Sequence, residues 1–455
     1  MAMTLRTYWW LVTSFTKKHR LKIIITAIIT AAIAAFTPSL LSLIPSGKPH
    51  YKIGLVGQYT VADLPLSIQN LVSLGLTTIA PDGSAAPALA QNWRVSDDGT
   101  TYTFSLDPSY LWQDGLPLQA AHINYALPDI SININSATEI EFKLKEPFAP
   151  FPTIVSTPIF REVKTISTLL RNTQQNLVGT ATYHLKNIKY RGQFLDSIVL
   201  ESTAEKRTYR FYTTERAAIL AFKLGEVQSL DHLAETAELA SWPNVQIQSQ
   251  THLDRYVAIF FNTSDPLLSD KNVRQALAYA IPDKAQGGER ALGPLHPQSW
   301  AFNSQVKDYS TDIPRAKELL DEAVGGNDDI NRTIRLYTTL AYLDTAEKIK
   351  AAWKELGIDA DIRVINSPPE EYQALLVVHQ IPPDPDQYTL WHSTQESTNI
   401  TKLKDPRIDK LLEDGRKTTN LEERQTIYQD FQRFLLEESP AVFLFYQTTY
   451  TISRK

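Results

Sequence analysis

An apolar run near the start of the chain restricts its fold more than any other feature. Between residues 21 and 44 the only charged side chain is Lys22. The uncharged part, 23–43, has about the 20 residues that a helix needs to cross a bilayer core. Cations lie just before it and, by the positive-inside rule, hold that side in the cytoplasm: Lys17, Lys18 and Arg20. We therefore predict a cytoplasmic basic stub over 1–20, a transmembrane anchor over 21–44 and an extracytoplasmic body, as in a single-pass protein of the cell membrane.

Two other interpretations of the apolar run stay open. A cleaved signal peptide has an apolar region of about 7–15 residues followed by small residues, and Ala34–Ala35 is a weak candidate for its cleavage site. A helix buried in a soluble core is the second alternative. Pro38 lies inside the run and predicts a kink in any helix formed there. The length of the run favours the retained anchor.

The body that follows the run is acidic and too long for one compact core. The chain has 455 residues, so at least two lobes are expected. The first 49 residues carry six of the 45 basic side chains and no acid, which leaves 39 basic against 50 acidic side chains in the rest. This balance disfavours a nucleic-acid partner. Cysteine is absent, which excludes disulfides, Cys-ligated zinc and a lipidated N-terminal Cys.

Two stretches of the body predict elements through local signals. Apolar residues alternate on both sides of Asp97–Gly99, which predicts a β-hairpin over 93–106. Asn420 has the side chain of a helix N-cap, and Pro440 predicts the end of the helix that it opens. The apolar segment 441–446 then predicts a buried strand.

A β–α–β unit is predicted over 333–364. Residues 333–338 alternate between apolar and polar, and residues 358–364 do so again. Between these strands Asp344 is expected to cap a helix, and Gly357 is expected to end it. The body is therefore predicted to be α/β.

Motifs of catalysis are missing from the sequence. There is no G-x-S-x-G elbow, H-E-x-x-H, P-loop or G-x-G-x-x-G, so no enzyme is predicted and no cofactor is expected. His379 and His392 are near each other in sequence with Asp384 and Asp386 between them, and a metal site is conceivable there. The favoured interpretation is a polar, Pro-rich loop with no metal bound.

Several motifs together resemble the extracytoplasmic solute-binding proteins of ABC importers, in the oligopeptide- and dipeptide-binding class. They occur in the order and approximate spacing of that family. They are P-x-L-A-x-x-W…S-x-D-G-x-x-Y-x-F at 87–104, W-x-D-G-x-P-L at 112–118, G-T-A-T-Y at 179–183, V-R-Q-A-L-A-Y-A-I at 273–281 and D-K-L-L at 409–412. Each motif alone is weak, whereas the ordered set is specific.

The resemblance implies a two-lobed periplasmic-binding-protein-like fold (type II, peptide-binding class) with a hinge. Lobe I is expected over 50–258, completed by 441–455, and lobe II over 259–440. The implied function is a tethered receptor that closes on a ligand of the peptide class and delivers it to ABC permease subunits. The alternative is a tethered extracytoplasmic sensor or interaction protein on the same fold without transport. A third hypothesis is an exported hydrolase. It would need a nucleophile and a base that the fold brings together from distant positions of the sequence.

Ligand contacts are predicted on the loop over 379–392 and near the junction of the lobes. The loop candidates are polar or aromatic, as ligand clefts require: Asp384, Asp386, Tyr388, Trp391 and His392. Asn262 and Trp300 are candidates at the junction, with a strand-end cap and core packing as the respective alternatives. Trp93, Trp112, Asp114 and Arg274 are expected to be structural.

Three departures from the family pattern qualify the resemblance. Relatives hold a peptide's α-amino group with an acid four residues before the Pro of an acid–Pro pair, but that position is Ile381 here. The chain is also short between Tyr125 and the stretch 130–144, which is expected to leave part of the cleft open. The lipobox Cys is absent, so the apolar run is expected to tether the body instead.

Overall fold

The computed structural model describes residues 48–166, 173–325, 332–367 and 369–455, with residues 9–10, 13–22, 25–26 and 30 before them. Residues 51–203 and 207–455 form one compact unit, and residues 1–50 with 204–206 form another. Most of the predicted anchor over 21–44 lies outside the described residues. Within the described part of the chain, no helix combines the length and the apolar character that crossing a bilayer requires.

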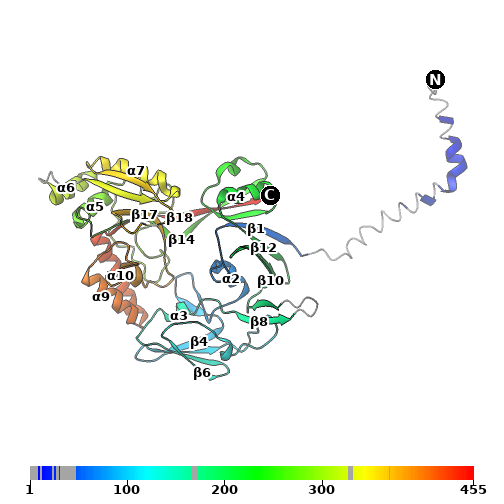
Figure 1. Cartoon of the computed structure of the whole chain (residues 1–455), viewed down its shortest axis with the longest axis horizontal. Coiled ribbons are helices and arrows are strands. Elements are labelled where there is room, and N and C mark those ends of the chain that lie inside the picture. The colour runs from blue at the N-terminus through cyan, green and yellow to red at the C-terminus, as the bar shows by residue number, and fades with distance from the viewer. Residues whose placement is uncertain are drawn as a thin grey trace. The chain divides into compact units, whose positions relative to one another are not determined.

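A large mixed sheet runs through the body. Among the described residues it has ten strands in the order β10-β11-β12-β1-β13-β18-β14-β17-β15-β16 (Figure 1). The bounds of its strands are β1 His50–Val56, β10 His184–Arg191, β11 Phe194–Glu201, β12 Lys206–Tyr212, β13 Ser229–Leu233, β14 Val245–Phe261, β15 Thr333–Thr338, β16 Asp359–Val364, β17 Ala374–Gln380 and β18 Ala441–Arg454. The long strands β14 and β18 pair side by side in its middle and continue from one set of cores to the other.

Residues 256–446, which we call the second lobe, contribute two cores on opposite faces of the sheet, each covered by helices. On strand β14, Val257 and Ile259 belong to one core and Ala258 and Phe260 to another, because successive side chains of a strand point to opposite faces. Helices α5, α6 and α7 contribute to the first of these cores, and α8, α9 and α10 to the second (Figure 1). Their bounds are α5 Lys271–Ala280, α6 Ile313–Val324, α7 Leu343–Lys354, α8 Tyr388–Trp391, α9 Pro406–Lys417 and α10 Leu421–Glu438.

The first lobe, residues 51–252 with the end of β18, contains three smaller cores. One lies on the antiparallel sheet β4-β5-β7-β6, a second under α2 and the strands β10 to β12, and a third under α4. The remaining helices are α2 Leu66–Val72, α3 Phe151–Ile154 and α4 Glu215–Lys223, and the 3-10 turns are η1 Ala120–His122, η2 Ala237–Ser241 and η3 Leu340–Tyr342. The remaining strands are β2 Thr77–Ile79, β3 Ala85–Pro87, β4 Ala90–Val95, β5 Thr101–Leu106, β6 Ser131–Ser136, β7 Glu139–Lys143, β8 Arg161–Ile166 and β9 Thr173–Val178.

The predicted hairpin and the predicted strand after Pro440 are confirmed. Strands β4 and β5 pair antiparallel with Val95 opposite Tyr102, and Gly99 in the turn has a φ of 68° that favours glycine. The Asn420 side chain caps α10 by accepting a hydrogen bond from the backbone N–H of Glu423. The strand after Pro440 is β18, which is longer than predicted because its second half pairs with β13 as well as β14.

The β15–α7–β16 unit is also confirmed, with one correction at the start of its helix. The two strands pair in parallel, and Gly357 follows the helix with a φ of 79°. Asp344, however, is not the N-cap, which is Tyr342. The 3-10 turn η3 leads directly into α7, so the helical backbone already exists before Asp344, and this carboxylate lies in the first turn instead.

Strands β14 and β18 shift their register at two neighbouring places, between His252 and Tyr256 and between Val257 and Ala258. Gln447 pairs with His252 and Tyr446 with Tyr256, so residues 253–255 of β14 bulge out of the ladder. A bulge of this kind bends a strand pair locally. Arg274 of α5 is structural as predicted, since its guanidinium donates to the carbonyls of Leu268 and Glu438 at 2.8 and 2.7 Å.

Candidate ligand-binding cleft

A cavity of about 240 Å³ lies between the two lobes of the body. The β4–β5 hairpin and α3 supply its wall in the first lobe, and the loop before α8 and the start of α10 supply the opposite wall. The lining residues are Ser84, Ala85, Trp93, Val95, Tyr102, Ala149, Pro152 and Thr153 from the first lobe, and Trp300, Asp384, Thr419, Leu421 and Arg424 from the second. The predicted candidates Asp384 and Trp300 are therefore in one cavity.

Asp384 forms a buried ion pair with Arg424 at the floor of this cavity. The guanidinium Nη1 and Nη2 atoms donate to the two carboxylate oxygens at 2.8 and 2.6 Å, and Nε donates to the carbonyl of Gly415 at 2.7 Å. The two side chains are only 9% and 6% exposed. Burial alone would lower the pKa of Arg424, but the charge of Asp384 outweighs it and holds that pKa above its ordinary value. Asp384 is consequently not a free carboxylate for a ligand cation.

Aromatic rings surround the ion pair. The Arg424 guanidinium lies 5.4 Å from the Trp300 ring and 5.3 Å from the Tyr428 ring, which are cation–π distances. Across the cavity, Trp93 packs against Phe104 with its ring centroid 5.9 Å away. Burial raises the pKa of Tyr102 to about 12, so its hydroxyl stays protonated and donates a hydrogen bond to the Phe148 carbonyl. The cleft is thus lined by rings around a neutralised charge pair.

Asp386 is engaged by a second arginine. Nε and Nη2 of Arg416 donate to one oxygen of Asp386 at 3.1 and 2.8 Å, and the backbone N–H of Tyr388 donates to the other at 3.1 Å. The Arg416 guanidinium also lies 4.0 Å from the ring centre of Tyr388 and 5.3 Å from that of Phe148. Asp386 and Tyr388 therefore position Arg416 against the first lobe, and they are not among the residues that line the cavity.

The other loop candidates lie deeper in the second lobe. Trp391 is fully buried in the core formed by α8, α9 and α10. His392 is buried too, with Nδ1 at 2.8 Å from the Thr394 hydroxyl and Nε2 at 3.4 Å from a carboxylate oxygen of Glu413. Asn262 caps the end of β14, because its amide donates to the Tyr372 carbonyl and accepts from the Ser264 N–H. These contacts agree with the alternative prediction for Asn262, a cap at the end of a strand.

The position expected to hold a peptide's α-amino group is apolar and inaccessible. Ile381 is 3% exposed and belongs to the core around Trp391. Its backbone N–H donates to the Asp254 carbonyl, which fixes it at the end of β17. With Ile381 buried and Asp384 and Asp386 both paired to arginines, this loop offers no carboxylate for an ammonium group.

Two backbone hydrogen bonds connect the lobes at the rim of the cavity. The N–H of Trp300 donates to the Asp82 carbonyl at 3.1 Å, and the N–H of Ala149 donates to the Arg416 carbonyl at 2.8 Å. Gly83 has a φ of 83°, and a Cβ atom at this position would lie 2.3 Å from the Pro383 carbonyl oxygen. The first lobe and the loop before α8 are therefore in direct contact.

Arg424 and Trp93 are the cavity residues that sequence reasoning missed or assigned to structure alone. Arg424 occupies the same helix face as Tyr428, Phe431 and Leu435, which are all buried. A cation on an apolar stripe requires a buried partner, and that signal could have drawn attention to it. Trp93 was expected only to stabilise its hairpin, but it also lines the cavity between the lobes.

The conceivable metal site over 379–392 is not assembled. His379 packs against Tyr256 and Phe260, with ring centroids 5.5 and 6.0 Å away, while His392 faces Thr394. In the described ranges, no three His, Asp or Glu side chains come together in a way that could hold a metal ion.

The family assignment follows from a comparison with known families. The model of the bacterial extracellular solute-binding proteins, family 5 Middle, matches residues 84–399, which include Trp93 and Trp300 from the two walls of the cavity. The chain belongs to this family of solute-binding proteins. It is accordingly a solute-binding protein of the ABC-importer type, and the family's described role is to bind solutes rather than to catalyse a reaction.

Individual relatives support the same assignment. The chain is 22% identical to the oligopeptide-binding protein AppA of Bacillus subtilis, over 88% of this chain and 87% of that protein. It is 24% identical to the dipeptide-binding protein of Escherichia coli, over 81% and 82%. The structure of NikZ from Campylobacter jejuni in complex with Ni(L-His) superposes with a TM-score of 0.71 at 23% identity, covering 90% of this chain and 94% of that one. This likeness shows the two-lobed α/β fold that the motifs predicted.

Proposed function

We propose that this solute-binding protein is a membrane-tethered receptor that captures a peptide between its lobes and delivers it to an ABC permease. The cavity between the lobes carries the proposal, because its walls come from both lobes and its rim is closed by two backbone hydrogen bonds. A ligand that contacts both walls binds the closed arrangement better than the open one, and only such a difference can drive closure. The bulge over residues 253–255 is the place where we expect the hinge.

The peptide class is supported by the named ligands of relatives and by the chemistry of the cavity walls. AppA of Bacillus subtilis and the Escherichia coli relative are named for binding oligopeptides and dipeptides. Trp93 and Trp300 offer broad, rigid rings to side chains of varied shape. The loop over 379–392 offers no unpaired carboxylate, so we propose that the peptide is held without an ion pair between this loop and its α-amino group.

A thermal-shift comparison of peptide pools tests this proposal. The full chain would be mixed with tri- to nonapeptide pools of matched sequence, with free or acetylated N-termini, and with amino-acid and sugar pools as controls. A ligand at 100 times its Kd stabilises by about 2.7 kcal/mol, which is a measurable shift. We expect free and acetylated pools to shift the melting temperature equally. A shift restricted to free N-termini would contradict the proposed binding mode, and a shift with no peptide pool would contradict the peptide class.

The tether is proposed from the apolar run over 21–44 and its preceding cations. Membranes from cells that produce the full chain would be washed with alkaline carbonate, which removes peripheral proteins, and then treated with protease from the outer side. An anchored, exported body stays in the membrane fraction and is digested from outside. Release of a shortened chain into the medium would show that the run is a cleaved signal instead.

A sensor or interaction protein without transport is the second candidate. The match to AppA extends over 476 aligned positions but uses only 88% of this chain's 455 residues, so many positions of that relative have no counterpart here. The loss of such positions from the cleft would favour a role with fewer ligand contacts. Reconstitution with an ABC permease and its ATPase from the same organism separates the two roles, since a transport receptor stimulates ATP hydrolysis when its ligand is present and a sensor does not.

A further inference from the structure

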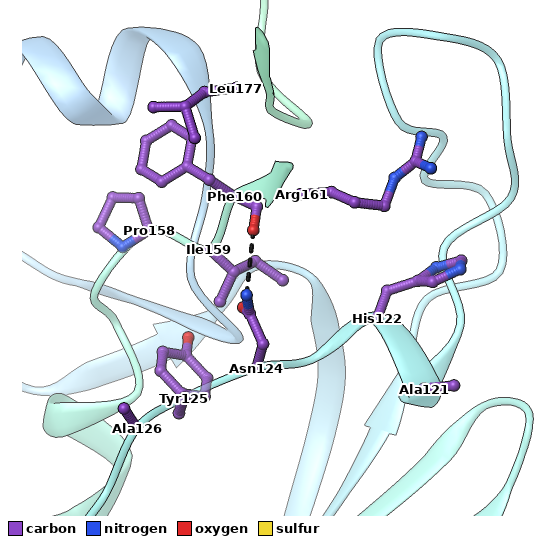
Figure 2. Close-up of a pocket in the computed structure, with 10 residues that line it drawn as sticks. All are labelled: Ala121, His122, Asn124, Tyr125, Ala126, Pro158, Ile159, Phe160, Arg161 and Leu177. Atoms are coloured by element: carbon purple, nitrogen blue, oxygen red, sulfur yellow. Dashed lines mark hydrogen bonds between the residues drawn. The ribbon is translucent and has the colours of Figure 1, made fainter. Parts of the chain in front are cut away.

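The first lobe contains a hollow of its own, away from the cavity between the lobes. It has a volume of about 630 Å³ and lies between the segment 121–126 and the segment 158–161 (Figure 2). Its lining is mixed, with Arg161, His122 and Asn124 on one side and Pro158, Phe160 and Leu177 on the other. No residue of this hollow belongs to the second lobe.

An apolar cavity of about 320 Å³ adjoins this hollow. Pro158, Phe160 and Leu177 line both spaces, so the two spaces are adjacent and share these side chains as part of their walls. The apolar cavity extends from there between helix α2 and strands β10 and β11, where Ile68 and Leu200 are among its walls. We call the mixed hollow the mouth and the apolar cavity the bore. A mixed mouth beside an apolar bore offers one place for the polar head of an amphiphile and another for its tail.

Arg161 is the cation of the mouth. Its guanidinium donates to a carboxylate oxygen of Asp114 through one Nη atom and lies 5.5 Å from the Trp112 ring. The Nε atom is buried and has no hydrogen-bond partner among the described residues. An arginine has five N–H donors, so Asp114 leaves several of them for a further acceptor. A carboxylate in the mouth can accept from the Nη donors that Asp114 does not use.

His122 adds a neutral donor beside Arg161. Its Nδ1 accepts hydrogen bonds from the Trp112 indole N–H at 3.0 Å and from the Gln119 backbone N–H at 3.2 Å. The proton of the neutral ring is therefore on Nε2. Burial and the neighbouring Arg161 lower the pKa of His122, so the ring is neutral at pH 7. Asn124 is already engaged, since its amide donates to the Phe160 carbonyl (Figure 2).

We propose that the mouth and the bore together bind a linear amphiphile with a carboxylate head and an unbranched hydrocarbon tail. The carboxylate accepts from Arg161 and His122, and the tail passes Phe160 and Leu177 into the bore. The bore has room for about ten groups of the size of a water molecule, each of about 30 Å³ in the liquid, which corresponds to a tail of about ten carbons. The site is separate from the cavity between the lobes and does not rest on the proposed transport function.

Titration with carboxyl-labelled alkanoates tests the site directly. The full chain, held in amphipol, would be mixed with ¹³C-carboxyl octanoate, decanoate and dodecanoate below their micelle concentrations, and the carboxyl resonance followed from pH 3 to 8. We expect affinity to rise about fourfold for each added methylene until the bore is full. We also expect the bound carboxylate to have a lowered pKa because it lies beside Arg161. Decanol, which has the tail without the charge, should bind at least tenfold more weakly.

Two variants and two matched controls decide between this site and simple partitioning. Arg161→Gln should return the pKa of the bound carboxylate to that of the free acid, whereas Arg94→Gln, on an exposed arginine of β4, should not. Ala62→Trp adds bulk at an exposed position of the bore and should weaken decanoate binding, whereas Leu66→Trp, exposed on α2 outside the bore, should not. Equal binding by all four variants, or a resonance identical to that in empty amphipol, would overturn the proposal. Displacement of decanoate by an apolar peptide but not by dodecanoate would assign the bore to a protein segment instead.

Discussion

The ion pair of Asp384 and Arg424 at the floor of the cleft is expected to affect the stability of the protein strongly. Their ion pair is nearly inaccessible to water, and the removal of one member leaves the other charge buried without a partner. We therefore expect Asp384→Asn to lower the free energy of unfolding by about 3–5 kcal/mol. The double variant Asp384→Asn, Arg424→Gln should recover much of this loss, because it buries no charge. Urea denaturation of the full chain measures both.

An exposed pair in the same lobe is the control for this prediction. Lys410 and Asp414 form an i,i+4 ion pair on α9, and their side chains are 67% and 39% exposed. Asp414→Asn should change the free energy of unfolding by about 0.5 kcal/mol or less, since exposed pairs contribute little. If Asp384→Asn were as mild as Asp414→Asn, the pair at the floor of the cleft would not be the buried contact described above.

His379 is expected to make the free energy of unfolding of the protein sensitive to acid. Burial beside Tyr256 and Phe260 lowers its pKa from 6.5 to about 4. In the unfolded chain the histidine takes up a proton as pH falls below 6.5, whereas the folded protein does not until about pH 4, so stability decreases between these values. The loss is about 3 kcal/mol at most. His379→Phe keeps the ring and should flatten this part of the stability profile, as measured by urea denaturation from pH 7 to 4.

The control for His379 is a neighbour that does not titrate in acid. Burial raises the pKa of Tyr256 well above its ordinary value, so Tyr256→Phe removes a hydroxyl from the same cluster without changing proton uptake in this range. Its stability profile should have the slope of the unmodified chain. An unchanged slope in His379→Phe would assign the acid sensitivity to other groups.

At the scale of elements, the sequence predicted those helix ends that depend on residues within one turn. Asn420 caps α10 and Gly357 ends α7 as predicted, because a cap depends on residues within one turn. Asp344 was assigned to the wrong position because the preceding 3-10 turn leaves no signal of its own in the sequence. The ion pair of Asp384 and Arg424 could not be predicted, since 40 positions separate the partners and only the packing of α10 against the loop brings them together.

The cap of α10 gives a prediction for a whole element, because this helix carries Arg424 in its first turn. Asn420→Ala removes the side-chain oxygen that accepts from the Glu423 N–H at 3.0 Å, and should lower the free energy of unfolding by about 1 kcal/mol. Asn420→Ser keeps a capping oxygen and should be nearly neutral. The midpoints of urea denaturation compare the two, and equal midpoints for Ala and Ser would show that the cap does not stabilise α10.

At the scale of the whole body, the two lobes are linked in two different ways. Strands β14 and β18 join them through the sheet, with the bulge over 253–255 as a local bend. The rim contacts of Trp300 with Asp82 and of Ala149 with Arg416 join them on the other side of the cavity. Lobe opening requires that the rim contacts break while the strand pair persists. The fold could be inferred from the order of motifs, whereas these contacts arise only from the packing of the two lobes.

Gly83 provides a way to open the rim without touching the cavity lining. A Cβ atom at this position would lie 2.3 Å from the backbone carbonyl oxygen of Pro383, on the opposite lobe. An alanine at position 83 therefore fits only if the two lobes move apart here. Gly115→Ala is the matched control, because Gly115 has a similar φ of 86° in the same lobe and nothing lies within 4 Å of its added Cβ. Both variants incur the same type of backbone strain, but only the first disturbs closure.

We expect Gly83→Ala to have a larger radius of gyration than Gly115→Ala by small-angle X-ray scattering without ligand, at equal thermal stability. A smaller closed population reduces the apparent affinity by the same factor, so the peptide pool with the largest thermal shift should bind about tenfold more weakly to Gly83→Ala than to Gly115→Ala. Equal scattering and equal affinity would mean that the contact between Gly83 and Pro383 does not control closure, and the proposed coupling between the rim and ligand capture would then be wrong.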